Sequence, residues 1–468
     1  MMSLSAAAAA LGGRLLDAGG EPAGDVAGRT FSAVSTDSRT ATSGTLFIAL
    51  SGENFDGHAF VALVAAAGAV AAVVADEAAA GLAGAGLPLI AVADTRLALG
   101  RLAAHWREGF ELPLIAVTGS NGKTTTKEMI AAILAAAYGD AVLATQGNFN
   151  NDIGLPLTLL RLNGSHRAAI VELGMNNPGE IDYLTRIARP TVAVITNAQR
   201  AHLQGMGSLD AIALEKGAIY GSLAGDGVAV INEDDPHAPL WRAQSASRRV
   251  VGFGLGPGAE VRGNVRLHGL DTELHFITPT GEGAVDLALP GLHNARNALA
   301  AVAATYAAGV PFAAIERGLA AFKGVKGRLQ RRAGLNGAVV LDDTYNANPD
   351  SVRAGIDVLA STIGRKILVL GDMGEIGEAS AQYHDEIGGY AKSAGVDALF
   401  ALGEASVVAA RNFGDGACHY KKVEELIDAL KPALTANTTV LVKGSRFMRM
   451  ERVADAIAPA PTEDAPCS

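Results

Sequence analysis

The sequence predicts an α/β protein of three domains, and three observations support that fold class. The chain has 468 residues, about three times the roughly 150 residues of a typical domain. Short apolar runs rich in β-branched residues alternate with segments of helical periodicity, which is typical of parallel sheets covered on both faces. Hydrophobic residues make up 49% of the chain and charged residues only 18%, which excludes intrinsic disorder for its body.

In the N-terminal region, residues 1–108, strand and helix patterns alternate least clearly, and we expect a small α/β domain there. Its uncharged stretch at residues 59–75 approaches the length of a membrane span. Because it is mostly Ala and Val with Gly68 in the middle, we interpret it as a short helix, a turn and a buried strand. The first 13 residues lack the basic region of a signal peptide. We therefore expect no membrane insertion and a cytoplasmic location.

Residues 109–324 are expected to form a central domain with a mostly parallel sheet. Its strands are predicted at residues 113–119, 141–145, 168–174, 191–197 and 227–232. Most of the connections are long enough for a crossover helix. Alternation around the turn residues 279–283 then predicts an antiparallel hairpin between residues 265 and 290.

Residues 325–458 are expected to form a Rossmann-like α/β domain. Its strands are predicted at residues 338–343, 366–372, 398–403 and 439–444, and their spacing of about 30 residues suits repeated βαβ units. The stretch GVKGRL (324–329) has the composition of a linker before this domain. The Pro-rich residues 459–468 are expected to be a disordered tail.

Charge and cysteine content narrow the possible partners. Lys and Arg number 38 against 48 Asp and Glu, a formal net charge of −10, and aromatic residues make up only 5%. Neither phosphate contacts nor base stacking therefore favours a nucleic-acid binder. The two cysteines, Cys418 and Cys467, lie far apart, which argues against a disulfide framework or a structural zinc site.

The strongest local signal is the Gly-rich turn TGSNGKTT (118–125), between a predicted strand and a helical run at 127–137. In such a unit the backbone N–H groups and the helix dipole point at phosphate oxygens. Lys123 would reach the β and γ phosphates, and the Thr124 hydroxyl would contact Mg²⁺. Val117 stands where the usual pattern has its first Gly, and GKT also occurs by chance. The flanking strand and helix nevertheless favour a phosphate-binding P-loop.

The P-loop alone leaves the reaction open. The NKxD motif with which GTPases read guanine is absent from the sequence. A small-metabolite kinase, usually a single domain, would leave about two thirds of the chain without a role. We therefore expect a second, larger substrate.

Further motifs are spread over the chain from about residue 30 to residue 457. They are STDSR (35–39), LFIALSGENFDGH (46–58), GNFNNDIGLP (147–156), VELGMNNPGEI (171–181), TNAQRAHL (196–203), LPGLHNARNALAA (289–301) and LDDTYNANPDS (341–351). Together with the P-loop, whose Val117 is ordinary in that family, they resemble the Mur ligases, the ATP-dependent amide-forming enzymes of peptidoglycan synthesis. GNFNNDIGLP and LDDTYNANPDS resemble the member that adds D-alanyl-D-alanine. The DNPR motif of the diaminopimelate-adding member is absent.

The resemblance implies an N-terminal domain for the UDP-sugar, a central P-loop ATPase and a C-terminal domain that brings the amino component. It implies that ATP phosphorylates the carboxylate of a UDP-N-acetylmuramoyl-tripeptide and that the amine of D-alanyl-D-alanine attacks the acyl phosphate, with release of ADP and phosphate. Such a site must neutralise two anions, the γ-phosphate and the carboxylate. We expect it to work in a monomer.

Lys123, Lys216, His202 and Glu172 are the candidate catalytic residues. The resemblance implies that Mg²⁺, as two ions, is held by Thr124, Glu172, His202 and Lys216. Without the resemblance, the ordinary interpretations are a solvated strand-end acid for Glu172 and a packed or capping histidine for His202.

Lys216, in ALEKGAIY (213–220), resembles the lysine that related ligases carbamylate with CO₂ to hold the second ion. Carbamylation needs a neutral amine, so burial or neighbouring cations would have to lower the pKa of this lysine. The alternatives are an unmodified ammonium that contacts phosphate and a solvated lysine on a helix face.

The other candidates bind nucleotide or substrate by resemblance. The nucleotide set is Gly119, Ser120, Asn121, Gly122, Lys123, Thr124, Thr125, Asn294, Asn297, Arg328, Asp343 and Tyr345, with His293 beside it. The substrate set is Ser35, Asp37, Ser38, Arg39, Asp56 and His58 for uridine and pyrophosphate, Asn148, Asn150 and Asn151 for the sugar or tripeptide, and Asn346, Asn348, Lys443, Ser445 and Arg446 on the dipeptide side. Several alternatives stay open: a helix cap for Asn294, adenine or dipeptide contacts for Tyr345, Asn346 and Asn348, and a surface salt bridge for the cations near residue 445.

Two rival functions are open at this point. Another ligase of the same family, or a folylpolyglutamate synthetase, would add a single amino acid. A P-loop protein that uses nucleotide only as a conformational switch would require neither a second substrate domain nor Lys216.

Overall fold

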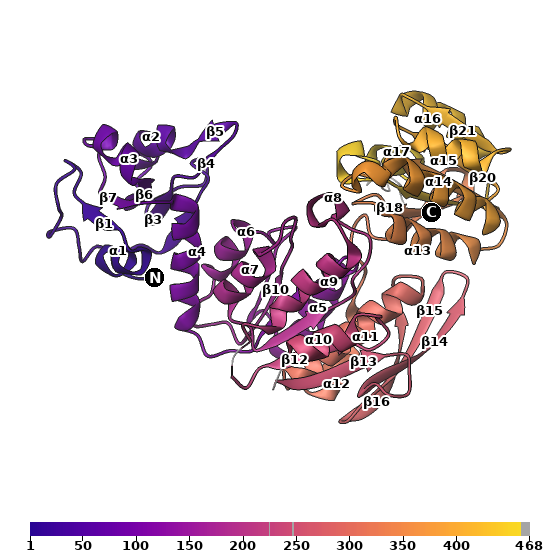
Figure 1. Cartoon of the computed structure of the whole chain (residues 1–468), viewed down its shortest axis with the longest axis horizontal. Coiled ribbons are helices and arrows are strands. Elements are labelled where there is room, and N and C mark those ends of the chain that lie inside the picture. Colours follow the sequence, from indigo (N-terminus) through magenta and orange to yellow (C-terminus); the bar gives the residue numbers. More distant parts are fainter. Residues whose placement is uncertain (224, 246–247, 460–468) are drawn as a thin grey trace, which may run out of the picture.

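The computed structural model describes residues 1–223, 225–245 and 248–459. Along the chain it forms three main sheets in succession, with a two-stranded hairpin beside the first and helices packed on each (Figure 1). This confirms the predicted α/β architecture in three parts. The predicted boundaries at residues 108, 324 and 458 stay predictions. Residues 460–468 of the predicted tail lie outside the described part of the chain.

The first sheet has five strands in the order β1-β7-β6-β3-β2, all parallel except β1. Residues 59–75 fold as predicted, into a short helix, a turn at Gly68 with φ of 89°, and a buried strand. None of the helices in the described residues is long and apolar enough to cross a membrane. The elements are β1 (Arg14–Leu16), β2 (Ala33–Ser35), β3 (Thr45–Ile48), β6 (Ala71–Ala75), β7 (Leu89–Val92), the hairpin β4 (Ser51–Gly52) and β5 (Phe55–Asp56), and the helices α1 (Leu4–Leu11), η1 (Gly57–Phe60), α2 (Val61–Ala66), α3 (Asp76–Ala79) and η2 (Ala80–Leu82).

The second sheet has nine strands in the order β16-β15-β14-β13-β12-β11-β8-β10-β9. From β9 to β14 neighbouring strands are parallel, and β14, β15 and β16 form an antiparallel meander. The predicted hairpin is confirmed as β15 and β16, to which β14 adds a third strand. The strands are β8 (Leu114–Thr118), β9 (Val142–Ala144), β10 (Ala168–Glu172), β11 (Val192–Ile195), β12 (Val228–Asn232), β13 (Arg249–Gly254), β14 (Val261–His268), β15 (Asp271–Thr278) and β16 (Gly281–Leu287).

Helices cover both faces of this sheet because its parallel strands are apolar on both faces. Ile115 and Val117 of β8 belong to a core with α5, α11 and α12, whereas Leu114 and Ala116 belong to a second core with α4, α6 and α7. That second core continues through α4 into the first sheet. The helices are α4 (Thr95–Glu108), α5 (Lys123–Tyr138), α6 (Gly154–Leu159), α7 (Glu180–Ala188), α8 (Leu203–Met206), α9 (Leu209–Gly217), η3 (Ala218–Tyr220), α10 (Ala238–Gln244), α11 (Leu292–Ala307) and α12 (Phe312–Ala321).

The third sheet has six strands in the order β17-β18-β22-β19-β20-β21, all parallel except β17. One face packs against α13, α14 and α15, and the other against α16 and α17. Its elements are β17 (Gln330–Ala333), η4 (Leu335–Gly337), β18 (Val339–Asp343), α13 (Pro349–Ala360), β19 (Arg365–Gly371), η5 (Gly377–Ala379), α14 (Ser380–Ser393), β20 (Ala398–Leu402), α15 (Ser406–Phe413), β21 (Ala417–Tyr420), α16 (Val423–Leu430), η6 (Lys431–Ala433), β22 (Thr438–Lys443), η7 (Arg446–Met448) and α17 (Glu451–Ile457).

Candidate active site

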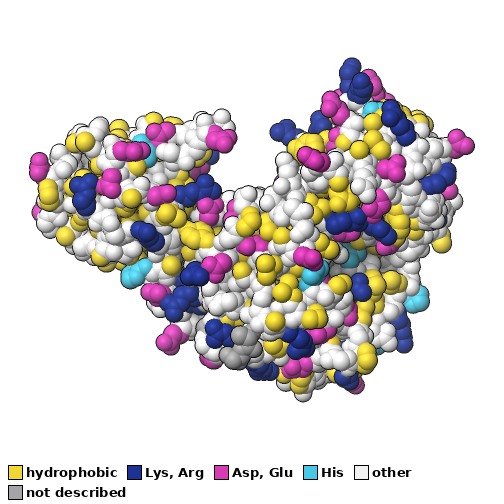
Figure 2. Space-filling model, viewed as in Figure 1, with side chains coloured by type: hydrophobic (Ala, Val, Ile, Leu, Met, Phe, Trp, Pro, Cys, Tyr) yellow, Lys and Arg dark blue, Asp and Glu magenta, His cyan; other side chains and the backbone are white. Residues whose placement is uncertain are grey.

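A cavity of about 1030 Å³ lies where the carboxyl ends of the second and third sheets face each other. On the face drawn in Figure 2, the molecule is also hollowed between its N-terminal and C-terminal parts. Ligands of open α/β sheets bind at this end of the strands. The cavity lining includes these predicted site residues: Ser120, Asn121, Gly122, Lys123, Thr124, Thr125, Asn148, Asn150, Asn151, Glu172, His202, His293, Asn294, Asn297, Arg328, Asp343, Tyr345, Asn346, Asn348 and Lys443.

The P-loop runs from the end of β8 to the start of α5, which begins at Lys123, four residues before the predicted helical run. Its two glycines have positive φ, 150° at Gly119 and 82° at Gly122. A Cβ at Gly119 would lie 1.8 Å from Thr196 Oγ1, and one at Gly122 would lie 2.1 Å from Asn297 Oδ1. Only glycine therefore fits this path of the backbone.

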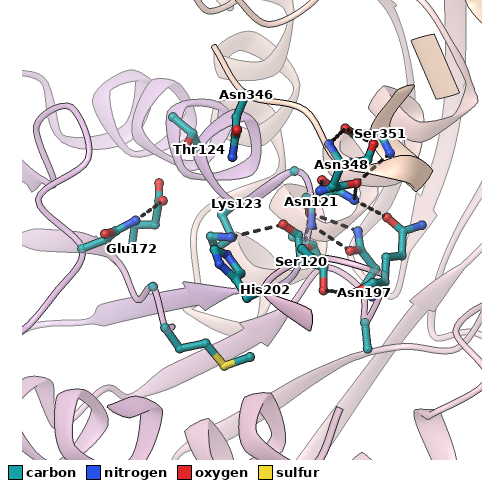
Figure 3. Close-up of a pocket in the computed structure, with 18 of the residues that line it drawn as sticks. Ser120, Asn121, Lys123, Thr124, Glu172, Asn197, His202, Asn346, Asn348 and Ser351 are labelled. Atoms are coloured by element: carbon teal, nitrogen blue, oxygen red, sulfur yellow. Dashed lines mark hydrogen bonds between the residues drawn. The ribbon is translucent and has the colours of Figure 1, made fainter. Parts of the chain in front are cut away.

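The segment after β11 holds the P-loop from below (Figure 3). Ser120 N donates to Asn197 O at 3.0 Å, and Asn121 N donates to Asn197 Oδ1 at 2.9 Å. Thr196 Oγ1 donates to Asn121 O at 2.6 Å, and the Ser120 hydroxyl bonds the backbone of Gln199. These bonds fix the loop and use the N–H groups of Ser120 and Asn121, so the N–H groups at the start of α5 are the ones placed for a phosphate.

Lys123 bridges the P-loop with its ammonium group, which donates to Gly119 O at 2.7 Å and to Ser120 O at 3.3 Å. Burial lowers the pKa of Lys123, and the negative charge of Glu172 partly opposes that shift. Lys123 and Glu172 therefore act on each other electrostatically across the cavity, with the lysine on α5 and the acid at the end of β10.

Glu172 is buried, with a relative exposure of 2%. Its Oε1 accepts a hydrogen bond from Asn150 Nδ2 at 2.8 Å, while its Oε2 is buried without a hydrogen-bond partner. A buried carboxylate oxygen without a partner is costly unless a cation or donor arrives. This oxygen therefore fits a ligand for Mg²⁺.

The number of protein oxygens near Glu172 also suits Mg²⁺. No group of three His, Cys, Asp or Glu side chains that could hold a metal occurs in the described residues. Mg²⁺ is commonly held by one or two protein oxygens together with water and nucleotide phosphates. One carboxylate and the Thr124 hydroxyl match that pattern.

His202 lies at the start of α8 in a left-handed conformation, with φ of 58°. Its Nδ1 is 2.9 Å from Glu375 Oε2, so it faces a carboxylate of the C-terminal domain. The hydrogen bond from His202 lowers the pKa of Glu375. Glu375 is itself in the left-handed region, with φ of 61°, and it lines the cavity.

Lys216 does not belong to the cavity lining, but it is almost completely buried in α9, with a relative exposure of 1%. Burial lowers the pKa of Lys216 well below its ordinary value, and the positive charge of Lys123 lowers it further. Both effects shift this lysine toward the neutral amine that carbamylation requires. The alternative of a solvated lysine on a helix face is wrong.

The start of α11 brings His293, Asn294 and Asn297 to the other side of the P-loop. The helix-cap alternative for Asn294 is wrong: the N-cap is Gly291, and Asn294 Nδ2 donates to Pro290 O at 2.8 Å. Asn297 Nδ2 donates to Asn294 Oδ1 at 3.2 Å, which leaves Asn297 Oδ1 beside Gly122.

The C-terminal domain contributes a second half of the site. Arg328 stacks on Tyr345, with its guanidinium carbon 4.0 Å from the ring centroid, and its Nη2 lies 3.5 Å from Thr124 Oγ1. Arg328 Nε is buried without a partner in the described residues. An arginine held in this way beside the P-loop suits a bound phosphate.

Two contacts order the loop after β18. Asn348 Nδ2 donates to Asn121 Oδ1 at 2.8 Å, which joins the P-loop to the N-cap of α13 (Figure 3). Lys443 Nζ donates to Asp343 Oδ2 at 2.6 Å and to Asn346 O at 2.9 Å. Burial lowers the pKa of Lys443, and Asp343 opposes the shift.

Two predicted residues of the third sheet lie outside the cavity lining. Ser445 Oγ accepts from Gly374 N at 2.7 Å and donates to Ala347 O at 3.1 Å, so it braces the loops around the cavity. Arg446 is exposed and paired with Glu451 at 3.0 Å, which is the surface salt bridge that the sequence left open.

Six predicted residues lie outside the cavity lining, on β2, on the hairpin β4-β5 or in the segments that follow them: Ser35, Asp37, Ser38, Arg39, Asp56 and His58. Ser35, Asp37 and Arg39 form one hydrogen-bonded group, and Asp56 and His58 form another. Arg39 bonds Asp37 and lowers the pKa of that carboxyl to about 2, and His58 bonds Asp56 with the same result. His58 Nε2 accepts from Ala75 N at 2.9 Å, so its Nδ1 carries the proton toward Asp56.

Sequence reasoning missed several lining residues, among them Asn197, Asn232, Asp234 and Glu375. Asn197 and Asn232 could have been found, because each stands at the carboxyl end of a predicted parallel strand. Glu375 could not, because its place depends on how the third sheet packs against the second.

Three family models match the chain in succession. They are the Mur ligase family, catalytic domain over residues 30–107, the Mur ligase middle domain over residues 117–305, and the Mur ligase, glutamate ligase domain over residues 327–446. The curated UDP-N-acetylmuramoyl-tripeptide--D-alanyl-D-alanine ligase of Escherichia coli strain K12 is 41% identical over an alignment 443 residues long, which covers 92% of this chain and 94% of that protein.

Solved structures are similar over almost the whole chain. MurF from Acinetobacter baumannii has a TM-score of 0.89 and 37% identity, covering 97% of this chain and 98% of that one. MurF ligase from Thermotoga maritima, in complex with ADP, has a TM-score of 0.78 and 26% identity, covering 91% of this chain and 96% of that one.

The partly buried His293 gives the site a pH-dependent stability. Burial lowers the pKa of His293 from 6.5 to about 4. The unfolded chain therefore takes up a proton at this residue at a higher pH than the folded chain, and stability that is intact above pH 6.5 is lost as the pH falls toward 4. We expect the unfolding free energy of the wild type, relative to His293→Gln, to fall by about 1–2 kcal/mol between pH 7 and pH 4.

Urea denaturation at each pH measures this difference. His268→Gln, at an exposed position of β14, is the matched control and should show a difference that does not change with pH. A pH-independent difference for His293→Gln as well would contradict the burial argument.

Proposed function

The chain belongs to the Mur ligase family, and we propose that its cavity forms the new amide bond through an acyl phosphate. The activity is that of the relatives described above: ATP-dependent addition of D-alanyl-D-alanine to UDP-N-acetylmuramoyl-tripeptide in peptidoglycan synthesis. Addition of a single amino acid and a switch without a ligation step are thereby set aside.

One observation carries the proposed mechanism: Lys123, the partner-free oxygen of Glu172 and the guanidinium of Arg328 converge on one cavity. A free carboxylate does not form an amide, because oxide is a poor leaving group. Phosphorylation of the carboxylate supplies phosphate as the leaving group, but it requires two anions to approach each other. Cations placed around the γ-phosphate lower that barrier.

The protein groups divide this task between them. The N–H groups of the P-loop and the Lys123 ammonium bind the β and γ phosphates, and Arg328 approaches from the C-terminal domain. Asn297 and the partly buried His293 would contact the adenine end of the nucleotide. Asn150, which holds Glu172, lies with Asn148 and Asn151 where the tripeptide would enter.

Mg²⁺, when bound, neutralises charge between the γ-phosphate and the carboxylate. Thr124 and Glu172 are the residues that would hold the first ion, since both line the cavity and Glu172 Oε2 has no hydrogen-bond partner. His202 would serve a second ion, together with a carbamate on Lys216. This carbamate forms when the neutral amine of Lys216 attacks CO₂ and releases one proton.

The dipeptide would bind on the C-terminal side of the cavity, where Asn346, Asn348 and Lys443 lie. Its amine then attacks the acyl carbon, the bond from carbon to the phosphate oxygen breaks, and inorganic phosphate leaves. The amine loses one proton in this step. Since Lys443 is already paired with Asp343, it would hold the carboxylate of the dipeptide only by sharing its charge.

The surface on the first sheet would bind the uridine diphosphate end of the tripeptide substrate. Ser35, Ser38 and Arg39 are exposed or partly exposed there. We propose a monomer as the working unit. ATP as a substrate supports a cytoplasmic location.

An acceptor assay tests the function directly. With ATP, Mg²⁺ and the UDP-muramoyl tripeptide, phosphate release should require D-alanyl-D-alanine and should stay at least about tenfold slower with D-alanine or a diamino acid as acceptor. Identification of the pentapeptide product by mass spectrometry is the second readout. ATP turnover that proceeds unchanged without tripeptide and dipeptide would contradict a ligase.

The role of Lys216 has its own test. Lys216→Ala should lose most of its activity because the charge of the carbamate is missing, by about 10²-fold or more. Excess bicarbonate should not restore it, whereas a short carboxylic acid should restore part of it. Lys392→Ala, on an exposed helix end of the third domain, is a control that should keep full activity. Full activity of Lys216→Ala would contradict the proposal.

A further inference from the structure

Residues 196–202, between β11 and α8, contact the P-loop of the central domain with some side chains and the C-terminal domain with others. Asn197 and Gln199 bond the P-loop residues Asn121 and Ser120. Arg200 and His202 bond carboxylates of the C-terminal domain instead. In Figure 1, α8 at the end of this segment reaches the edge of the C-terminal domain. One short segment therefore joins the P-loop to the domain that faces it.

Arg200 makes the most extensive of these interdomain contacts. Its Nη2 and Nε donate to Asp350 Oδ1 at 2.6 and 3.0 Å, and its backbone N–H donates to Asp350 Oδ2 at 2.8 Å. Its Nη1 and Nη2 donate to the two carboxylate oxygens of Glu386 at 2.8 and 3.0 Å. Its guanidinium carbon also lies 5.3 Å from the centroid of the Tyr383 ring.

This arrangement is stronger than an ordinary surface ion pair. Only 22% of the Arg200 and Asp350 side chains is exposed, and 30% of Glu386. Bidentate, partly buried arginine pairs lose less of their strength to solvent than exposed pairs do. Glu386 is also bonded by Arg353 at 3.0 Å. Arg353 lies on α13, so that second pair stays within the C-terminal domain.

The partners of Arg200 connect it to the cavity. Asp350 lies in the first turn of α13, and the N-cap of that helix is Asn348, whose side chain bonds Asn121 of the P-loop. A fixed Asp350 therefore fixes the position of Asn348 on the P-loop. The loop that contains Tyr345 and Asn346 leads directly into α13. The position of this loop therefore depends on the position of the helix.

We propose that Arg200 is a positioning residue for the ligation reaction, which holds the C-terminal domain in the arrangement where α13 and its N-cap meet the P-loop. This inference rests on the proposed function, in which the C-terminal domain brings the dipeptide. Arg200 thereby sets the fraction of molecules whose cavity is complete before the dipeptide binds. An apparent affinity is reduced in proportion to that fraction.

Steady-state kinetics of Arg200→Ala provide the first test. The KM for D-alanyl-D-alanine should rise on the order of tenfold, while kcat at saturating substrates stays within about twofold, because substrate binding restores the complete arrangement. Arg200→Lys should be intermediate, since an ammonium group cannot bond both carboxylates in the same way. Arg353→Ala removes the other cation on Glu386 without crossing between domains, and its KM should stay within about twofold of the wild type.

A second measurement does not depend on turnover. Small-angle X-ray scattering with ADP and Mg²⁺ should give a larger radius of gyration for Arg200→Ala than for the wild type and Arg353→Ala. The wild type should approach the value of Arg200→Ala as the salt concentration rises, because salt screens ion pairs. Glu386→Gln removes one of the negative charges that bind Arg200, and it should raise KM and the radius of gyration as Arg200→Ala does. If Arg200→Ala fails to fold, Glu386→Gln provides the test.

The outcomes separate this inference from the function itself. Unchanged KM and unchanged scattering in both Arg200→Ala and Glu386→Gln would overturn the positioning role while leaving the ligase intact. A fall in kcat as large as the expected rise in KM, with KM itself unchanged, would also overturn the positioning role. A wild type that does not use D-alanyl-D-alanine would overturn the proposed function, and the scattering comparison would still decide whether Arg200 holds the domains together.

Discussion

The site depends on a backbone path that no side chain can enter. At Gly119 a Cβ would collide with Thr196 at 1.8 Å, and at Gly122 it would collide with Asn297 at 2.1 Å. Because these neighbours approach so closely, the loop presents its N–H groups to a phosphate instead of shielding them. The two collision partners come from the segment after β11 and from α11. The P-loop conformation, the parallel sheet and the cover of helices therefore determine one another.

The second constraint is electrostatic. The protein carries a formal charge of −10, yet the lysines of the site, Lys123, Lys216 and Lys443, are partly or wholly buried. Burial lowers the pKa of Lys123, Lys216 and Lys443. Lys123 and Lys443 are balanced by carboxylates, whereas burial and the charge of Lys123 shift Lys216 toward the neutral amine that the proposed carbamylation requires. A protein with an acidic surface can therefore bind a polyanionic substrate, because the cations at the cavity attract that substrate locally.

Most of the fold follows from the sequence, and the exceptions have physical reasons. The strands predicted for the second and third sheets are continuous apolar runs, such as LIAV in β8 and VLV in β22, and they are confirmed. The strands β13 and β14 are harder to recognise because Gly252 and Gly263 interrupt their patterns, and their exposed residues do not alternate strictly. The edge strands β17 and β21 are only four residues long. For the site, motifs locate the P-loop and strand-end residues, but Glu375 and Arg200 act across a domain contact that no local pattern encodes.

In the proposed reaction, the carboxylate of the tripeptide attacks the γ-phosphate within this cavity. Turnover of UDP-muramoyl tripeptide labelled with ¹⁸O in its terminal carboxylate tests it most directly, with mass analysis of the released phosphate. An acyl phosphate transfers one carboxylate oxygen to phosphorus, so each phosphate released during ligation should contain one ¹⁸O atom. Phosphate without ¹⁸O, formed together with the pentapeptide, would contradict the account.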